Sequence, residues 1–451
     1  MQRNSYQVFS TKQGNLLLEN LSIQNSKAKG QNGGNGGSST NAGSGAGGGG
    51  GGCGAGGALF GSNTAQITIK NSEFVNNLAQ GGDGGQVVSW HVFGGPSGGG
   101  LNGTSAGAGQ GNSGNQSGSP GPFGGGGAGG IYATKGSYRG GDGGIGGGGG
   151  GGCGEGSNGV ALAGSGGTGL LGGNGSVGSP HVGNRGGPGG SGGGGAGLGG
   201  ALFIDNSGSL ILSYDHQMIP FSQNSVQKGA AGRSGASDGQ QLGKDIMIMS
   251  GGNLTFEISS GINLVLANPI ESDREFAGGK GGIFTKDGPD TLDLSNLANT
   301  YTANETFIKN GKVIITDATN LGSVLKGTPN KIHLKNSGEL VINGSTIIDR
   351  ELILSKDIGS VESGTISVTP NNEVTWAGVI SNNGNLQKDG EGKLILTGKN
   401  NYTGVTTITT GTLEGTTDSI RGDVLNNGSL ILIKRLRVLF WEKYQEPDLS
   451  H

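Results

Sequence analysis

The chain has 451 residues, and 106 of them are glycine, so nearly one position in four has no side chain to bury. Other apolar residues make up 31% of the sequence and aromatic residues 5%, whereas an average soluble domain is roughly 40% apolar without its glycines. This composition argues against a tightly packed helical enzyme. The net charge of −3, without a basic stretch in the body of the chain, argues against nucleic acid as a partner.

The glycines are concentrated in residues 30–57 and 81–200, and two interpretations of these tracts are open. They could be disordered, because they bury too little apolar surface to offset the entropy lost on ordering. Alternatively, extended segments could pack side by side like polyproline-II helices, with hydrogen bonds between chains. The composition alone does not decide between the two.

The rest of the chain reads as short strands. Apolar and polar residues alternate, and Asn, Gly, Asp or Ser follow, in segments 66–70, 253–258, 263–266, 331–335, 365–369, 373–376 and 393–397. No apolar pattern with a helical period is sustained. We therefore predict an all-β fold.

Two kinds of internal repeat favour one all-β architecture. Segments 20–30, 71–81 and 220–229 resemble one another and each leads into glycine, and the same pentapeptide stands at 56–60 and 199–203. A longer unit at 283–313 returns at 385–413. Units that tolerate insertions of different length are typical of a solenoid, in which each coil contacts only its neighbours. We predict a parallel β-helix with long glycine-rich insertions, and a β-sandwich is the alternative.

In such a stack, asparagine side chains hydrogen-bond from coil to coil. Asn76, Asn77 and Asn224 end the related segments, so we expect them at corner or ladder positions.

The segment from Lys388 through Leu413, with Gly-Lys-Leu-Ile-Leu-Thr-Gly and Asn-Tyr-Thr-Gly at its centre, is similar to the autotransporter-associated β-strand repeat. The upstream half resembles the repeats of chlamydial polymorphic membrane proteins, whose signatures G-G-A-I and F-x-x-N appear with Leu59 and Leu202 in place of isoleucine. The resemblance implies a right-handed parallel β-helix passenger that is displayed on, or released from, the bacterial surface and commonly serves adhesion. It also implies a host-cell surface protein or glycan as the partner.

The resemblance further implies a signal peptide and a membrane-embedded translocator barrel, and neither is recognisable in this sequence. We therefore expect a fragment, whose contact with a membrane would be made only through a barrel missing from this chain. The expected parts are a partial coil (1–29), a glycine-rich insertion (30–57), a coil (58–80), a second insertion (81–200), a β-helix (201–433) and an atypical tail (434–451).

Cys53 and Cys153 both lie in Gly-Gly-Cys-Gly, one in each insertion. A disulfide between them would suit an oxidising compartment, and two thiols in mobile loops are the alternative. Two cysteines without nearby histidines do not make a four-ligand zinc site. The Gly-Gly-Asp-Gly-Gly strings at 81–85 and 140–144 do not match the calcium-binding nonapeptide, so we expect no metal and no cofactor.

Because β-helices also host polysaccharide lyases and hydrolases, a carbohydrate-active enzyme is the alternative function. The best carboxylate cluster is formed by Asp287, Asp290 and Asp293, with Asp273 and Glu275 nearby. Paired carboxylates can act as acid and base. These residues flank turn positions inside a repeat, however, and we expect a solvated loop without catalysis.

Arg421, Gly422 and Asp423 spell an integrin-recognition tripeptide. In a surface adhesin this is a candidate binding motif, and an ordinary turn between strands is the alternative.

Overall fold

The computed structural model describes residues 7–37, 46–88, 98–103, 119–130, 138–154, 165–180, 188–233, 235–273, 281–295, 297–323, 330–355 and 363–433. The predicted tail at 434–451 lies outside these residues. The described residues form 35 short β-strands and two 3₁₀ helices, η1 (Leu101–Gly103) and η2 (Ala318–Leu321). Within this part of the chain, no helix has the length and apolar character needed to cross a membrane.

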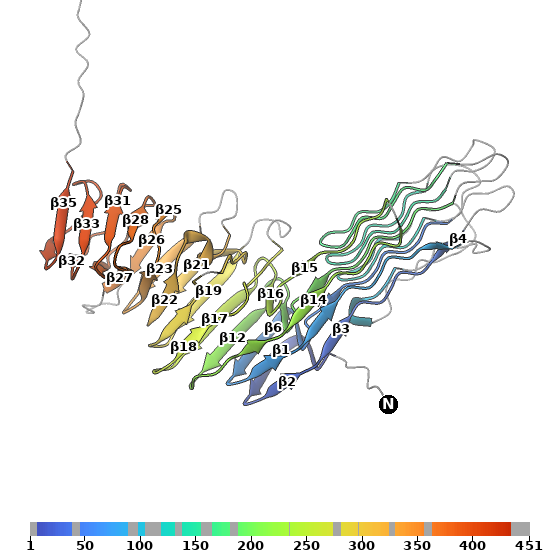
Figure 1. Ribbon diagram of the computed structural model, residues 1–451, viewed down its shortest axis with the longest axis horizontal. Coiled ribbons are helices and arrows are strands. Elements are labelled where there is room, and N and C mark those ends of the chain that lie inside the picture. The colour runs from blue at the N-terminus through green and yellow to red at the C-terminus, as the bar shows by residue number, and fades with distance from the viewer. Residues whose placement is uncertain are drawn as a thin grey trace, which may run out of the picture.

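Three sheets form the long body of the molecule (Figure 1). The largest contains, in spatial order, β16 (Ile246–Ile248), β11 (Leu202–Ile204), β6 (Leu59–Lys70), β12 (Ser209–Tyr214), β17 (Asn253–Ile258), β19 (Gly282–Asp287), β21 (Ala303–Ile308), β23 (Lys331–Lys335), β26 (Leu352–Ser355) and β29 (Ile380–Ser381), with β1 (Phe9–Glu19) beside β6. The second contains β18 (Asn263–Val265), β20 (Thr291–Asp293), β22 (Lys312–Ile315), β24 (Glu339–Ile342), β27 (Ser363–Val368), β30 (Asn385–Asp389), β32 (Thr406–Ile408) and β34 (Val424–Asn426). The third contains β25 (Thr346–Ile348), β28 (Glu373–Trp376), β31 (Lys393–Leu396), β33 (Thr412–Gly415) and β35 (Ser429–Leu432).

Four smaller sheets lie towards the N-terminus. They are β2 (Ser22–Gln24), β7 (Glu73–Val75) and β13 (Phe221–Ser222); β3 (Lys27–Lys29), β8 (Leu78–Gln80) and β14 (Ser225–Gln227); β5 (Gly54–Ala55), β10 (Gly197–Leu198) and β15 (Gln241–Leu242); and β4 (Gly36–Gly37) with β9 (Val87–Val88). Every pairing among the described strands is parallel. Parallel strands stacked coil on coil make a β-helix, and the sandwich alternative is wrong.

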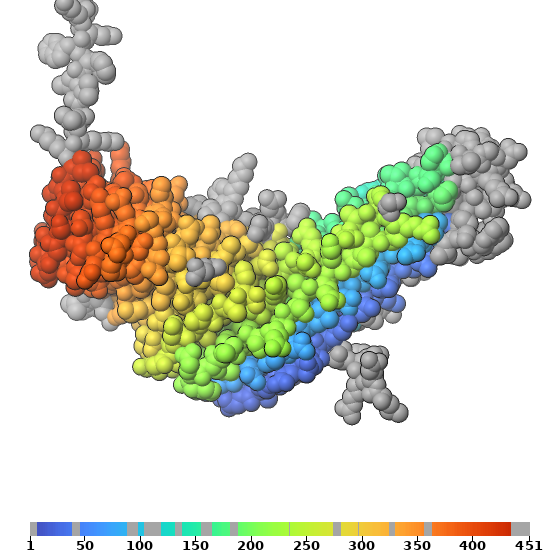
Figure 2. Space-filling model, viewed as in Figure 1, coloured from blue at the N-terminus to red at the C-terminus, as the bar shows by residue number. Residues whose placement is uncertain are grey.

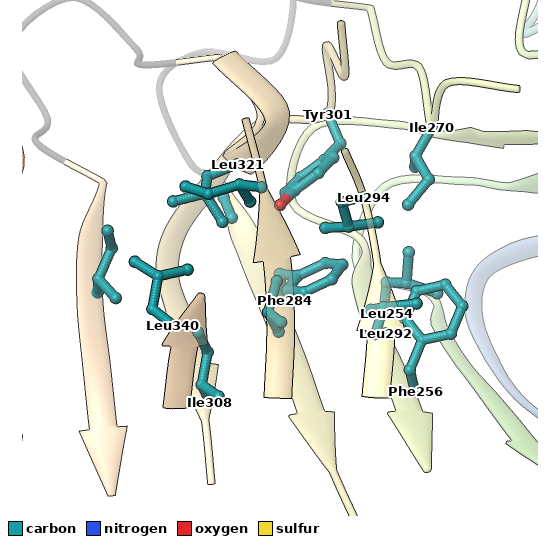
Figure 3. Close-up of a cluster of buried hydrophobic side chains, with 14 of the residues drawn as sticks. Leu254, Phe256, Ile270, Phe284, Leu292, Leu294, Tyr301, Ile308, Leu321 and Leu340 are labelled. Carbon is teal, nitrogen blue, oxygen red and sulfur yellow. The ribbon is translucent and has the colours of Figure 1, made fainter. Parts of the chain in front are cut away.

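The interior of the β-helix is a continuous apolar core. Strand β17 alternates buried and less buried positions, so Leu254 and Phe256 point inward, as side chains on one face of a strand must. Figure 3 shows these residues facing Phe284, Leu292 and Tyr301 of the following coils. The rings of Phe284 and Tyr301 stack with centroids 5.0 Å apart. Burial of such rows explains why each coil needs its neighbours.

The asparagines predicted at ladder positions occupy them. Asn77 Oδ1 accepts hydrogen bonds from the backbone amide and hydroxyl of Ser26, and Asn224 Oδ1 accepts from the amide and side-chain Nδ2 of Asn77. These three side chains are buried. Asn76 lies at an exposed corner in the left-handed backbone region and donates to Asn25 of the preceding coil. The prediction for Asn76, Asn77 and Asn224 is confirmed.

The two copies of the glycine-containing pentapeptide also stack. Leu59 pairs with Leu202, which in turn pairs with Ile246, and a glycine with φ between 63° and 67° precedes each of them by three residues. Ile246 therefore belongs to a third copy, Gly243-Lys244-Asp245-Ile246-Met247, which sequence comparison missed because only its first glycine and apolar pattern remain.

The glycine-rich tracts form a packed bundle. Residues 47–54 lie at its centre, and their amides donate in turn to three neighbouring segments. The amides of 47, 50 and 53 donate to the carbonyls of 130, 127 and 124. Those of 48, 51 and 54 donate to 190, 193 and 196, and those of 49 and 52 donate to 34 and 31. The carbonyls of this segment accept from 148 and 151, from 82 and 85, and from 99. The partners of this segment therefore repeat every three residues, and its hydrogen bonds go to neighbouring segments and not within it. This is the geometry of packed polyproline-II helices.

The neighbours of this central segment complete a hexagonal arrangement. Each bonds to the next around a ring formed by 31–36, 82–86, 190–195, 148–152, 124–130 and 98–100. Only glycine permits this spacing, because a Cβ at Gly50 would lie 1.8 Å from the carbonyl oxygen of Gly148. The disordered interpretation is wrong for the described parts of the tracts, and the packed interpretation is confirmed.

The bundle also includes a segment that the sequence placed in the β-helix. Gly229 and Gly232 donate to residues 195 and 192, and the segment 237–240 accepts from 194 and 197. The predicted β-helix of 201–433 therefore needs correction: it begins at β11 as expected, but residues 229–233 and 235–242 leave it as a third glycine-rich excursion that joins the other two. Figure 2 shows segments 31–37, 81–88 and 229–233 side by side as blue, lighter blue and yellow-green bands.

Two aspartates accept hydrogen bonds from backbone amides at the surface of the bundle. Asp83 Oδ1 accepts from the amide of Ala230 at 2.9 Å, and Asp142 Oδ1 accepts from the amide of Thr168 at 2.7 Å. These are the central residues of the two Gly-Gly-Asp-Gly-Gly strings. Their carboxylates accept from amides of exposed residues at the edge of the bundle.

A second, smaller core attaches the bundle to the β-helix. Phe60 and Phe203 point out of the large sheet and stack with centroids 5.2 Å apart. Around them pack Leu101, Phe123, Ile145 and Leu171, which lie at successive turns of the bundle. The bundle consequently projects sideways from the N-terminal coils (Figure 1).

Candidate functional sites

The three aspartates of the predicted carboxylate cluster each serve a turn. Asp287 accepts from the Gly288 amide at 2.7 Å and from Asn310 Nδ2 at 2.8 Å. Asp290 Oδ2 accepts from the Gly261 amide at 2.6 Å, and Asp293 Oδ1 accepts from the Ser295 amide at 2.8 Å. Because their acceptor oxygens are directed at separate backbone amides, these contacts hold the corners of the coils.

The pKa values of Asp287 and Asp290 do not suit a general acid. Burial raises the pKa of Asp287, but hydrogen bonds from Asn310 and Gly288, together with the charges of Lys309 and Lys286, outweigh it, so the pKa lies below its usual range. The Gly261 amide lowers the pKa of Asp290 in the same direction. A catalytic acid needs a raised pKa instead.

The two further carboxylates named with this cluster do not complete it. Asp273 is buried and accepts from the amide of Ser250 at 2.8 Å, and Glu275 lies outside the described residues. Among the residues that the structure describes, no three His, Cys, Asp or Glu side chains are placed to hold a metal ion.

Cys53 and Cys153 are both buried thiols, and the structure does not join them in a disulfide. Cys53 belongs to the second core beside Phe60, and burial raises the pKa of its thiol. Cys153 Sγ accepts from the amide of Tyr138 at 3.3 Å. Both cysteines lie within the packed bundle, and not in loops that leave it.

Two buried lysines occupy equivalent sites in the two long repeats, and the sequence analysis predicted neither site. Lys286 and Lys388 are the last residues but one of β19 and β30, at the same place in the two long repeats, and neither side chain is exposed. Lys286 Nζ donates to the carbonyls of Asp287, Gly288 and Asn310 at 3.0, 2.8 and 3.1 Å. Lys388 Nζ donates to the carbonyls of Asp389, Gly390 and Thr410 at 2.7, 2.6 and 3.3 Å. We call these two arrangements the lysine cages.

Each lysine cage joins two coils. The stem of Lys286 lies between Phe256 and Ile308 of adjacent strands, so its methylenes continue the apolar core. Desolvation lowers the pKa of both lysines to about 8. The signal in the sequence was the tripeptide Lys-Asp-Gly at inward parity in both repeats, where an apolar residue would normally stand.

The tripeptide Arg421-Gly422-Asp423 lies in the turn between β33 and β34, and all three residues are exposed. Gly422 has a φ of 68°. The turn between strands that was named as the alternative is present, and both charged residues in it are exposed.

Fold and sites together define the class of protein: a parallel β-helix whose coils carry a glycine bundle and whose long repeats each contain a lysine cage. Residues 284–315 and 386–414 match the family described as the passenger-associated-transport-repeat. The chain therefore carries two repeats of autotransporter passenger domains, as predicted for 283–313 and 385–413. The comparisons with curated proteins and with solved structures found no match. The resemblance of the upstream half to chlamydial polymorphic membrane proteins stays a prediction.

Proposed function

We propose that the chain is part of a surface-displayed autotransporter passenger, in which the β-helix is a stiff stalk and the glycine bundle projects from it towards a host-cell protein or glycan. The matched passenger repeats carry this proposal. The continuous core and the sideways bundle support the division into stalk and projection.

The proposal includes the absence of catalysis. Its support is that Asp287, Asp290 and Asp293 are each engaged by turn amides, and that the pKa values of Asp287 and Asp290 are lowered. An assay on polygalacturonate and other acidic glycans should give no turnover with the purified chain. Turnover that disappears in Asp290→Ala or Asp293→Ala would establish the carbohydrate-active alternative.

Surface display is tested on intact bacteria that express the complete protein. Protease added to the cell suspension should abolish detection of the β-helix by an antibody, while a cytoplasmic marker protein stays intact. Protection of the epitopes until the cells are lysed would contradict display.

The role of the bundle is tested by adhesion of the displayed protein to host cells. Gly229→Ala introduces a Cβ 1.9 Å from the carbonyl oxygen of Gly82 and should reduce adhesion, whereas Ala230→Ser, at the exposed neighbouring position, should not. Equal adhesion of the two variants at equal display would show that the bundle is not the contact surface.

A further inference from the structure

The backbone around Arg421-Gly422-Asp423 is fixed from the inside of the β-helix. The amide of Arg421 donates to the hydroxyl of Tyr402 at 3.0 Å, and Thr406 Oγ1 donates to the carbonyl of Arg421 at 2.7 Å. The amide of Thr406 donates to the carbonyl of Asp423 at 2.8 Å. Tyr402 and Thr406 are buried and contact each other at 2.6 Å. The turn is therefore preorganised on a rigid support.

The glycine between the two charges has a structural role. Gly422 has a positive φ, and a Cβ there would lie 2.1 Å from the carbonyl oxygen of Gly404. Its position accordingly fixes the relative directions of its neighbours, because no other residue fits without displacing the backbone.

The two charged side chains have no such role. In the described part of the chain, the side chains of Arg421 and Asp423 make no hydrogen bond or ion pair, and all the contacts above use backbone atoms. The fold thus uses the backbone of these two residues and neither of their charges.

We propose that Arg421 and Asp423 are a recognition pair for a receptor of the integrin type. The Asp423 carboxylate would complete the coordination of a divalent cation held by the receptor, since carboxylate oxygens suit Mg²⁺, Mn²⁺ and Ca²⁺. The Arg421 guanidinium would pair with an acidic group of the receptor, which its planar fork matches. A rigid turn lowers the entropy lost on binding. This inference rests on the proposed surface display.

The test uses the purified 451-residue chain and an immobilised integrin ectodomain that binds Arg-Gly-Asp peptides, with Mn²⁺ present. Asp423→Glu keeps the charge but moves the carboxylate by one methylene, and should weaken binding by roughly thirtyfold, the loss typical of an interface hot spot. Arg421→Lys should weaken binding to a lesser extent. The matched control is Asp418→Glu, which changes another exposed aspartate beside the same turn. A chelator and a soluble Arg-Gly-Asp peptide should each abolish binding.

Binding that is unchanged in Asp423→Glu, or that survives the chelator, overturns the inference. The inference is also overturned if the wild-type chain does not bind although a cooperative unfolding transition shows that it is folded. Neither result affects the protease test on intact bacteria, so failure of the recognition pair is distinguishable from failure of surface display.

Discussion

The lysine cages place a positive charge at inward-facing positions of the β-helix, most of which hold apolar side chains. Each ammonium group is held by three backbone carbonyls drawn from two successive coils. The same tripeptide produces the same geometry in both matched repeats, so the cage is a property of the repeat. It fastens neighbouring coils at a corner, where strand pairing has ended.

Lys388→Met should therefore destabilise the chain by about 2 kcal/mol, because buried carbonyls at the corner lose their donor. Chemical unfolding of wild type and variant measures the difference. Lys393→Met is the control, since Lys393 lies on the outer face between Glu373 and Glu414 and should matter far less. A variant as stable as wild type at neutral pH would show that the cage contributes nothing.

The cages also predict a pH dependence. Both lysines have a pKa of about 8 in the folded chain against 10.5 for an exposed lysine. Between these values the unfolded chain binds more protons than the folded chain, so the free energy of unfolding rises with pH; below them the cost of burying the charge is fully present. The stability difference between wild type and Lys388→Met should grow across this window, as unfolding titrations at several pH values would detect. A constant difference contradicts the lowered pKa.

Sequence reasoning at this scale succeeded where a side chain obeyed a simple rule. Asn77 and Asn224 were predicted because asparagine commonly stacks along parallel coils. Lys388 was missed because a lysine in an alternating strand is normally placed outside, and only its inward parity signals a cage. The open question of Cys53 and Cys153 needed three-dimensional positions, since spacing in a glycine tract says nothing about proximity.

At the scale of elements, the strands were predictable and the bundle was only one of two alternatives. Alternation in strands such as β17 and β31 has a period that side chains reveal. In a run of glycine the period of three is invisible. It emerges only at the surface, where Asn32 and Asn35 lie three residues apart and accept from the amides of Asp83 and Gln86.

The packing of the bundle predicts that substitutions at two adjacent positions differ in their effect on stability. Gly229→Ala should cost about 3 kcal/mol through overpacking against the neighbouring backbone, while Ala230→Ser should be neutral. Amide hydrogen exchange reads both effects: slow exchange of residues 47–54 should be lost in the first variant and kept in the second. Fast exchange of these amides in the wild-type chain would contradict the packed bundle itself.

For the whole molecule, the coils behave as modular units around one core. The sequence predicted this architecture from its repeats, but it divided the glycine tracts into separate insertions, because nothing along the chain shows that their described parts meet in space. Backbone hydrogen bonds, the second core and the Asp83 carboxylate join them.

Modularity predicts that removing a coil is tolerated better than charging the core. Leu394→Asp buries a charge without a partner at a fully buried position and should cost about 4 kcal/mol or more. Deletion of 331–351, the coil that contains β23, β24 and β25, brings β26 to the position of β23 and should retain a cooperative transition. Circular dichroism during heating compares the two. A deletion more damaging than the substitution would contradict the nearest-neighbour picture.

The central position of residues 47–54 has a consequence for synthesis and export. This segment emerges early, yet hydrogen-bonds with partners as distant as residue 196, so it must wait while most of its surroundings are still being made. Long-range closure of this kind is slow. An unpaired segment with apolar side chains would risk aggregation, whereas a run of glycine has no side chains with which a wrong partner could make contacts. The composition that lets the innermost helix fit among six others thus also protects it until they arrive.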